Sequence, residues 1–128
     1  IYNDNLTSGQ LREIIAARFA NPLVRSWFDP NVKVFNECAI IEKDPATGSV
    51  TEHRPDRVII HEGKITVIDY KFGNENDKYK EQVKCYMRLL NDMHYENIEG
   101  YLWYVMRDKI INVNGNREEN GNVNGNGN

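Results

Sequence analysis

The sequence has few of the residues and segments that mark several large classes of protein. Its two cysteines are too few for a disulfide framework, a four-cysteine zinc site or a four-cysteine iron–sulfur cluster. It has no continuous apolar run of about 18 residues, so we expect no membrane-spanning helix. It also has no GxxxxGK[ST] or GxGxxG loop, which argues against a nucleotide site. The net charge of -3 argues against binding nucleic acid through bulk positive charge, although a local basic patch stays open.

The remaining composition is that of an ordinary soluble domain. The chain has 128 residues, of which 40% are hydrophobic and 27% charged. One domain of this size buries roughly two-thirds of the surface of its unfolded chain. The first residues lack the basic and apolar regions of a signal peptide, so we expect a cytoplasmic location. Because the chain begins abruptly, we also expect it to be a fragment of a longer protein.

The C-terminal end differs from the rest of the chain. Residues 112–128 include eight asparagines and four glycines, and their only apolar side chains are Val113 and Val123. A segment of this composition cannot bury enough apolar surface to offset the entropy lost on ordering. We therefore predict a folded domain over residues 1–111 and a disordered tail over residues 112–128.

The hydrophobic pattern of the domain predicts alternating helices and strands. Thr7 and Gln10 fit a capping box at the start of the first helix. The predicted elements, in chain order, are a helix at Ser8–Ala20, strands at Val32–Ile41, Val50–His61 and Lys64–Phe72, a helix at Lys78–Met93 and a strand at Gly100–Arg107. The order α-β-β-β-α-β indicates an α/β or α+β domain with a mixed sheet of about four strands. Trp27, Trp103 and Tyr104 are expected in the core rather than as base-stacking platforms.

The stretch between Arg54 and Lys71 contains the most informative pattern. Glu62-Gly63 suits a two-residue hairpin turn, in which His61 faces Lys64. Counting back from this turn places Asp56 opposite Asp69, and Arg54 opposite Lys71, on one face of the sheet. Like charges directly opposite each other are destabilising. The hairpin therefore predicts two carboxylates beside a lysine, in an arrangement whose repulsion lowers the stability of the fold.

Two interpretations of this pair follow from the residues alone. Paired carboxylates either raise the pKa of one partner or bind a cation, and oxygen ligands favour Mg²⁺ or Mn²⁺. Such a metal activates water, and Lys71 would stabilise the negative charge that develops on a phosphodiester. Alternatively, both aspartates are strand-end residues in ordinary ion pairs with Arg54, Arg57 or Lys71. The residues leave both interpretations open.

These residues resemble a known family. Pro55-Asp56, followed after twelve residues by Asp69-Tyr70-Lys71, is similar to the signature of the PD-(D/E)xK nuclease superfamily. Gln82 and Tyr86 on the following helix resemble the further pattern of RecB-like nucleases, in particular the domain at the C-terminus of UvrD-type DNA helicases. The resemblance covers about residues 32–107. It implies a restriction-endonuclease-like fold.

The resemblance also implies roles for individual residues. Asp56 and Asp69 would bind the metal, with the backbone carbonyl of Tyr70 as a third ligand, and Lys71 would be the catalytic lysine. The cofactor would be Mg²⁺ or Mn²⁺. Gln82 would lie near the active site and help to place DNA or the lysine.

Three further expectations concern the surroundings of this site. Tyr86 would act with Gln82, although helix packing explains its position equally well. Glu37 occupies the preceding strand, where such domains often carry an acid, but a solvent-facing glutamate is an equal alternative. RecB-like nucleases usually have a metal-binding histidine on an earlier helix, and Ser8–Ala20 has none. We expect His53, His61 and His94 to be solvated.

The leading hypothesis is a metal-dependent DNA nuclease of exonuclease type. Its partners would be DNA and a helicase region of the same polypeptide, in DNA repair or recombination. A second hypothesis is a nuclease-like module that binds DNA or braces a helicase without cutting. A third is a plain interaction domain in which the acids form ion pairs.

Overall fold

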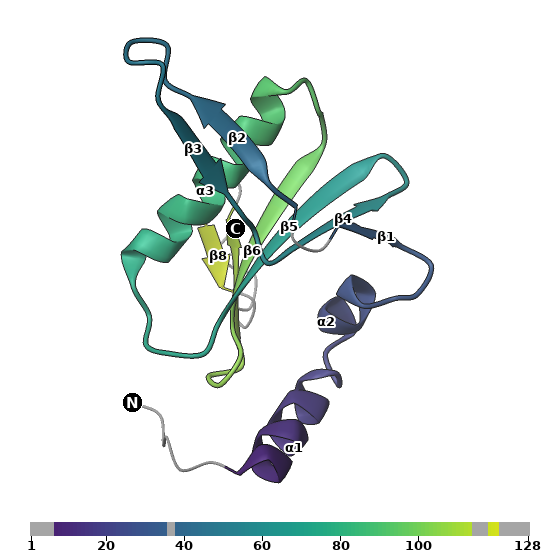
Figure 1. The fold of residues 1–128 in the computed structure, drawn as a ribbon. Helices are drawn as coiled ribbons and strands as arrows, with labels where there is room; N and C mark the ends of the chain where they lie inside the picture. Colours follow the sequence, from purple (N-terminus) through teal and green to yellow (C-terminus); the bar gives the residue numbers. More distant parts are fainter. Residues whose placement is uncertain (1–6, 36–37, 114–117, 121–128) are drawn as a thin grey trace.

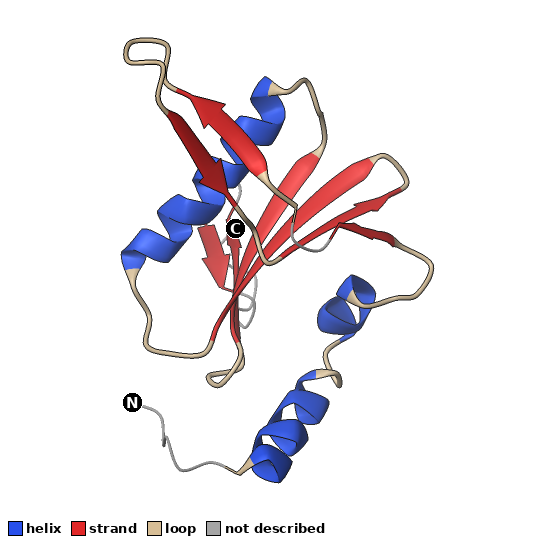
Figure 2. Cartoon of the chain, in the orientation of Figure 1, coloured by secondary structure: helices blue, strands red, loops and turns tan. Residues whose placement is uncertain are grey.

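The computed structural model describes residues 7–35, 38–113 and 118–120. The elements in chain order are α1 (Ser8–Arg18), α2 (Pro22–Trp27), β1 (Lys33–Phe35), β2 (Ile40–Lys43), β3 (Val50–His53), β4 (Arg57–His61), β5 (Lys64–Lys71), α3 (Asp77–Asp92), β6 (Ile98–Tyr104), β7 (Lys109–Val113) and β8 (Glu118–Asn120). Figure 1 traces them along the chain, and Figure 2 separates helices from strands. The predicted capping box at Thr7 and Gln10 begins α1.

The fold is a mixed sheet with helices on both faces. The strand order is β1-β4-β5-β6-β7-β8, and β2 and β3 form a separate hairpin. The pair β5–β6 is parallel because α3 connects the two strands, and the other described pairs are antiparallel. Helix α3 and the β2–β3 hairpin lie on one face of the sheet, and α1 and α2 lie on the other (Figure 1). The predicted α+β class with a mixed sheet is confirmed.

The β4–β5 hairpin has the predicted register. His61 pairs with Lys64, and Arg57 pairs with Ile68. Glu62 and Gly63 both have positive φ angles, of 52° and 80°. Two residues of this kind make a turn whose twist matches that of the strands. The local sequence therefore sets which side chains of β5 share a face.

Two predicted strands are each divided in the structure. The run predicted at Val32–Ile41 forms β1, which pairs with β4, and β2, which pairs with β3. The run predicted at Val50–His61 is interrupted at Arg54-Pro55 and forms β3 and β4. A proline has no N–H to donate to a strand ladder, so pairing stops there and the chain crosses to the main sheet. The prediction of about four strands was therefore too low.

The predicted domain boundary is also displaced. Strand β7 continues to Val113, which is fully buried, and so ordered structure extends past residue 111. Residues 118–120 form β8 against β7. Strand β7 was missed because its apolar residues merge into the Asn- and Gly-rich composition that follows. The rest of the predicted tail lies outside the described residues.

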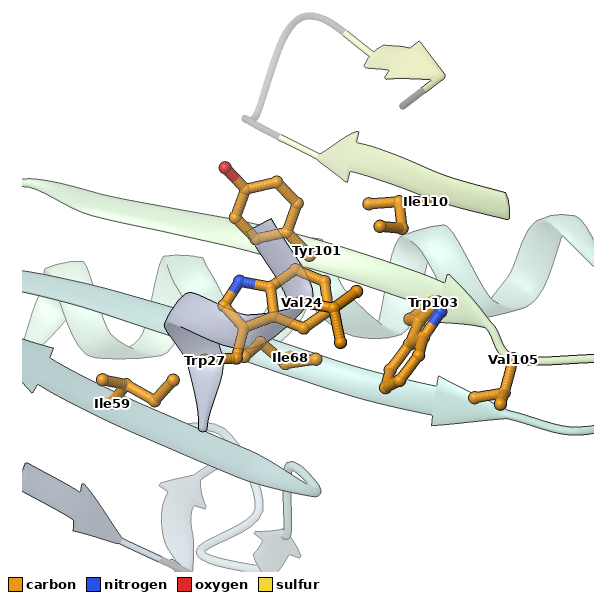
Figure 3. Close-up of a cluster of buried hydrophobic side chains, with 8 residues drawn as sticks. All are labelled: Val24, Trp27, Ile59, Ile68, Tyr101, Trp103, Val105 and Ile110. Carbon is orange, nitrogen blue, oxygen red and sulfur yellow. The ribbon is translucent and has the colours of Figure 1, made fainter. Parts of the chain in front are cut away.

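The core has two parts, one on each face of the sheet. Trp27 at the end of α2 meets Trp103 of β6 edge to face, with ring centroids 5.6 Å apart (Figure 3). On the other face, Val67 and Tyr86 belong to the cluster between β5 and α3. The predicted core positions of Trp27, Trp103 and Tyr104 are confirmed. No described helix is long and apolar enough to cross a membrane.

Helix α3 approaches strand β6 at Gly100. A Cβ atom at this position would lie 2.5 Å from Met87 Sδ and 2.8 Å from Val83 Cγ1. Real Cβ atoms do not approach other atoms this closely, so a side chain here would force Met87, Val83 or the helix itself to shift. The glycine thus allows α3 to pack closely against β6.

Candidate functional site

The two predicted aspartates lie together where β4 begins and β5 ends. The Asp56 backbone N–H donates to Asp69 Oδ1 at 3.3 Å, and the Tyr70 backbone N–H donates to Asp56 Oδ2 at 2.8 Å. Each carboxylate is thus held by the backbone of the opposite segment. Asp69 is 2% exposed. The reciprocal bonds keep two negative groups adjacent despite their repulsion.

The environment of Asp69 disfavours its charge. Burial, followed by repulsion from Asp56, raises the pKa of Asp69 from 3.8 to about 6, and the nearby Lys71 opposes this shift in part. Its Oδ2 atom is buried and accepts no hydrogen bond from the described residues. Lys71 Nζ lies 3.2 Å from that atom as an ion-pair partner. A bound cation would balance the negative charge of both aspartates.

Lys71 is held by three groups around its ammonium. Besides the contact with Asp69, Nζ donates to Gln82 Oε1 at 3.3 Å and lies 4.3 Å from the centroid of the Tyr79 ring. Asp69 and Lys71 share a face of β5 because side chains alternate along a strand. Gln82 and Tyr79 come from α3, so the helix and the strand together fix the lysine.

Tyr86 lies one helical turn after Gln82 on α3. It is 2% exposed, and burial, followed by the charges of Asp69 and Asp56, raises the pKa of its hydroxyl above the usual range. The hydroxyl therefore stays protonated next to the acid pair. The expected neighbourhood of Asp56, Asp69, Lys71, Gln82 and Tyr86 is present, while their roles stay predictions.

The other predicted residues differ in outcome. Arg54 does not face Lys71, because the paired part of β4 begins at Arg57, and its guanidinium lies 2.7 Å from Glu52 instead. The ligand role of the Tyr70 carbonyl stays a prediction. Glu37 lies outside the described residues.

A second cluster of polar side chains was not predicted as a site. Glu42 of β2, His53 of β3 and Cys85 of α3 each offer a ligand atom, and these atoms all lie within 4.8 Å of one another. The expectation of a solvated His53 was wrong. Its side chain is 20% exposed, and its Nε2 atom lies 3.0 Å from Glu42 Oε1. The register that pairs Ile40 with His53 brings the histidine to the same hairpin face as Glu42.

Both clusters lie near Tyr86. The His53 ring meets the Tyr86 ring edge to face, with centroids 6.2 Å apart. The charges of Asp69 and Asp56 act on the same tyrosine. The first cluster offers carboxylates and an ammonium, which suit a hard cation and a phosphate. The second cluster offers a carboxylate oxygen, an imidazole nitrogen and a thiol sulfur as ligand atoms.

Comparisons with known proteins leave the family of this chain open. No family model matches, and no curated protein matches. Among solved structures, one titled "Crystal structure of SSO0001" is 21% identical, with a TM-score of 0.46. The alignment covers 88% of this chain and 50% of that chain, so this chain spans about half the length of the matched protein.

Proposed function

We propose that this domain is a metal-dependent nuclease that hydrolyses DNA phosphodiester bonds. The observation that carries the proposal is the buried Asp69, whose carboxylate contacts the Asp56 backbone and the Lys71 ammonium. In this proposal Asp56, Asp69 and the Tyr70 carbonyl bind Mg²⁺ or Mn²⁺. The fold would be restriction-endonuclease-like, and the domain would serve beside a helicase in repair or recombination.

The ion and the lysine would divide the chemistry between them. When bound, Mg²⁺ supplies an activated water and polarises the phosphoryl group. The ammonium of Lys71, which Gln82 and Tyr79 hold in place, neutralises the negative charge that develops during attack. The protonated Tyr86 hydroxyl would donate to the acid pair and so help to place Asp69.

The test is cleavage of single- and double-stranded DNA with Mg²⁺ or Mn²⁺. We expect cleavage that a chelator abolishes and that Asp69→Asn reduces by about 100-fold or more. Asp92→Asn is the matched control, because Asp92 is an exposed aspartate at the end of α3 and should retain activity. Equal cleavage by Asp69→Asn and the unmodified protein would refute the proposal.

A second candidate function is a DNA-binding module that does not cut. It is favoured by the reciprocal backbone bonds of Asp56 and Asp69, which hold the acids in place without an ion. This alternative predicts DNA binding with no cleavage at any Mg²⁺ or Mn²⁺ concentration. A gel-shift assay beside the cleavage assay separates the two functions.

A further inference from the structure

We propose that Glu42, His53 and Cys85 form a second metal site, which binds Zn²⁺ or a similar transition-metal ion and links the β2–β3 hairpin to α3. This site is separate from the acid pair and does not depend on the proposed nuclease activity. Two of its ligand atoms come from the two strands of one hairpin, and the third comes from α3, which follows later in the chain.

The geometry of the cluster is close to what a tetrahedral ion needs. Two ligands at about 2.0–2.1 Å from such an ion lie about 3.3 Å apart. Glu42 Oε1 and His53 Nε2 lie 3.0 Å apart. The Cys85 Sγ atom lies within 4.8 Å of both. A side-chain adjustment of about 1 Å would bring the sulfur to the separation that a metal–sulfur bond of about 2.3 Å requires.

The ligand types select the metal. A thiolate and an imidazole are unfavourable ligands for Mg²⁺ or Ca²⁺, which prefer oxygen. Cysteine, histidine and glutamate together are ordinary zinc ligands, and three of them leave a fourth position open.

The positively charged side chain of Arg88 already contacts this cluster. Its Nη2 atom lies 3.4 Å from Glu42 Oε2 and 3.6 Å from Cys85 Sγ, so a cationic group already sits against two of the three ligands. Its Nη1 atom lies 3.6 Å from Asp92, and the side chain is 55% exposed. The guanidinium can therefore move towards Asp92 when a metal ion takes its place.

Cobalt spectroscopy of the metal-free chain tests the site. Co²⁺ takes the coordination of Zn²⁺ and gives a thiolate charge-transfer band when sulfur binds it. The Cys38→Ser variant should keep this band, and because the chain has two cysteines the band then reports Cys85 alone. Absence of the band in the unmodified chain and in Cys38→Ser would overturn the proposal.

Zinc titrations of variants provide the second readout. We expect His53→Ala, Cys85→Ser and Glu42→Gln each to weaken Zn²⁺ binding by more than about 100-fold, the upper end of what losing a supporting contact costs. His94→Ala, which alters an exposed histidine outside the cluster, should bind as the unmodified chain does. Unchanged binding in the three cluster variants, or an equal loss in His94→Ala, contradicts the site.

A gain of binding guards against variants that fail to fold. Arg88→Met removes the competing guanidinium and keeps the apolar stem, so Zn²⁺ should bind more tightly, by about tenfold or more, if about 1.4 kcal/mol of competition is removed. Weaker or unchanged binding by Arg88→Met would contradict the proposed place of the ion.

Discussion

The two polar clusters beside Tyr86 differ in burial and in ligand chemistry. The acid pair is built around Asp69, which is 2% exposed, and backbone N–H groups fix it. The second cluster joins three partly buried side chains, two of which, Glu42 and Cys85, also contact the exposed side chain of Arg88. Asp69 is buried, and Lys71 balances its negative charge only in part, whereas Glu42 and Cys85 already lie against the exposed guanidinium of Arg88. We therefore expect the first site to be rigid and the second to exchange its occupant.

The largest expected effect is a loss of DNA cleavage when the lysine beside the acid pair is removed. Lys71→Ala should reduce DNA cleavage by about 100- to 1,000-fold, because the ammonium stabilises developing negative charge. Lys64→Ala is the matched control on the same strand, since Lys64 is an exposed partner of Glu99. Rates measured at saturating Mg²⁺ would check this. Full activity of Lys71→Ala would remove the distinction between the clusters.

The pH dependence of stability sharpens the difference in burial. The pKa of Asp69 is about 6 in the folded protein and near 3.8 in the unfolded chain. The folded state therefore binds more protons in this window, and the metal-free protein loses stability as the pH rises from about 4 to above 6.

Denaturant unfolding at several pH values measures this loss. Asp69→Asn should flatten the profile, because the amide does not titrate. His61→Ala, which changes an exposed group at the β4–β5 turn, should leave the profile as it is. A profile that rises through the same window in the metal-free protein would show that Asp69 is stabilised as an anion.

A smaller effect is expected from moving the helix that both clusters share. Gly100→Ala places a methyl group against Met87 and Val83, and overpacking of this kind costs about 1–3 kcal/mol. Gly73→Ala is the control, because no atom lies within 4 Å of a Cβ built there. Thermal unfolding measures both. If Gly100→Ala is as stable as the control, α3 is free to shift and the clusters are less rigid than described.

The smallest effect on stability is expected in the β4–β5 hairpin, which carries the acid pair and no residue of the second cluster. Glu62 has a φ of 52°, a conformation that asparagine adopts more easily. Glu62→Asn should raise the free energy of unfolding by roughly 0.5 kcal/mol, a fraction of the cost of a left-handed residue. Zinc binding at Glu42, His53 and Cys85 should not change. Denaturant unfolding and a zinc titration of the same variant check both expectations.

The sequence predicts this hairpin well because its determinants are local. Two turn residues and the alternation of side chains suffice to place Asp69 and Lys71 on one face. Gln82 was found through a resemblance of pattern, and its contact with Lys71 is present.

Contacts between distant segments could not be derived in the same way. The proximity of His53 to Cys85 depends on how the β2–β3 hairpin lies on α3, which no local pattern specifies. The proline break at Pro55 was visible in the sequence, but it was not used to divide the strand. Strand β7 was missed because its pairing with β6 outweighs the polar composition around Asn112.

The placement of the two tryptophans has a practical consequence for experiments on this protein. Trp27 of α2 and Trp103 of β6 pack together on one face of the sheet (Figure 3). Tyr86, which lies near both polar clusters, belongs to the core on the other face. The intrinsic fluorescence of the two tryptophans should follow global unfolding while remaining insensitive to ions that enter on the opposite face. In one sample, tryptophan fluorescence could then report unfolding while the absorbance of bound Co²⁺ reports metal binding.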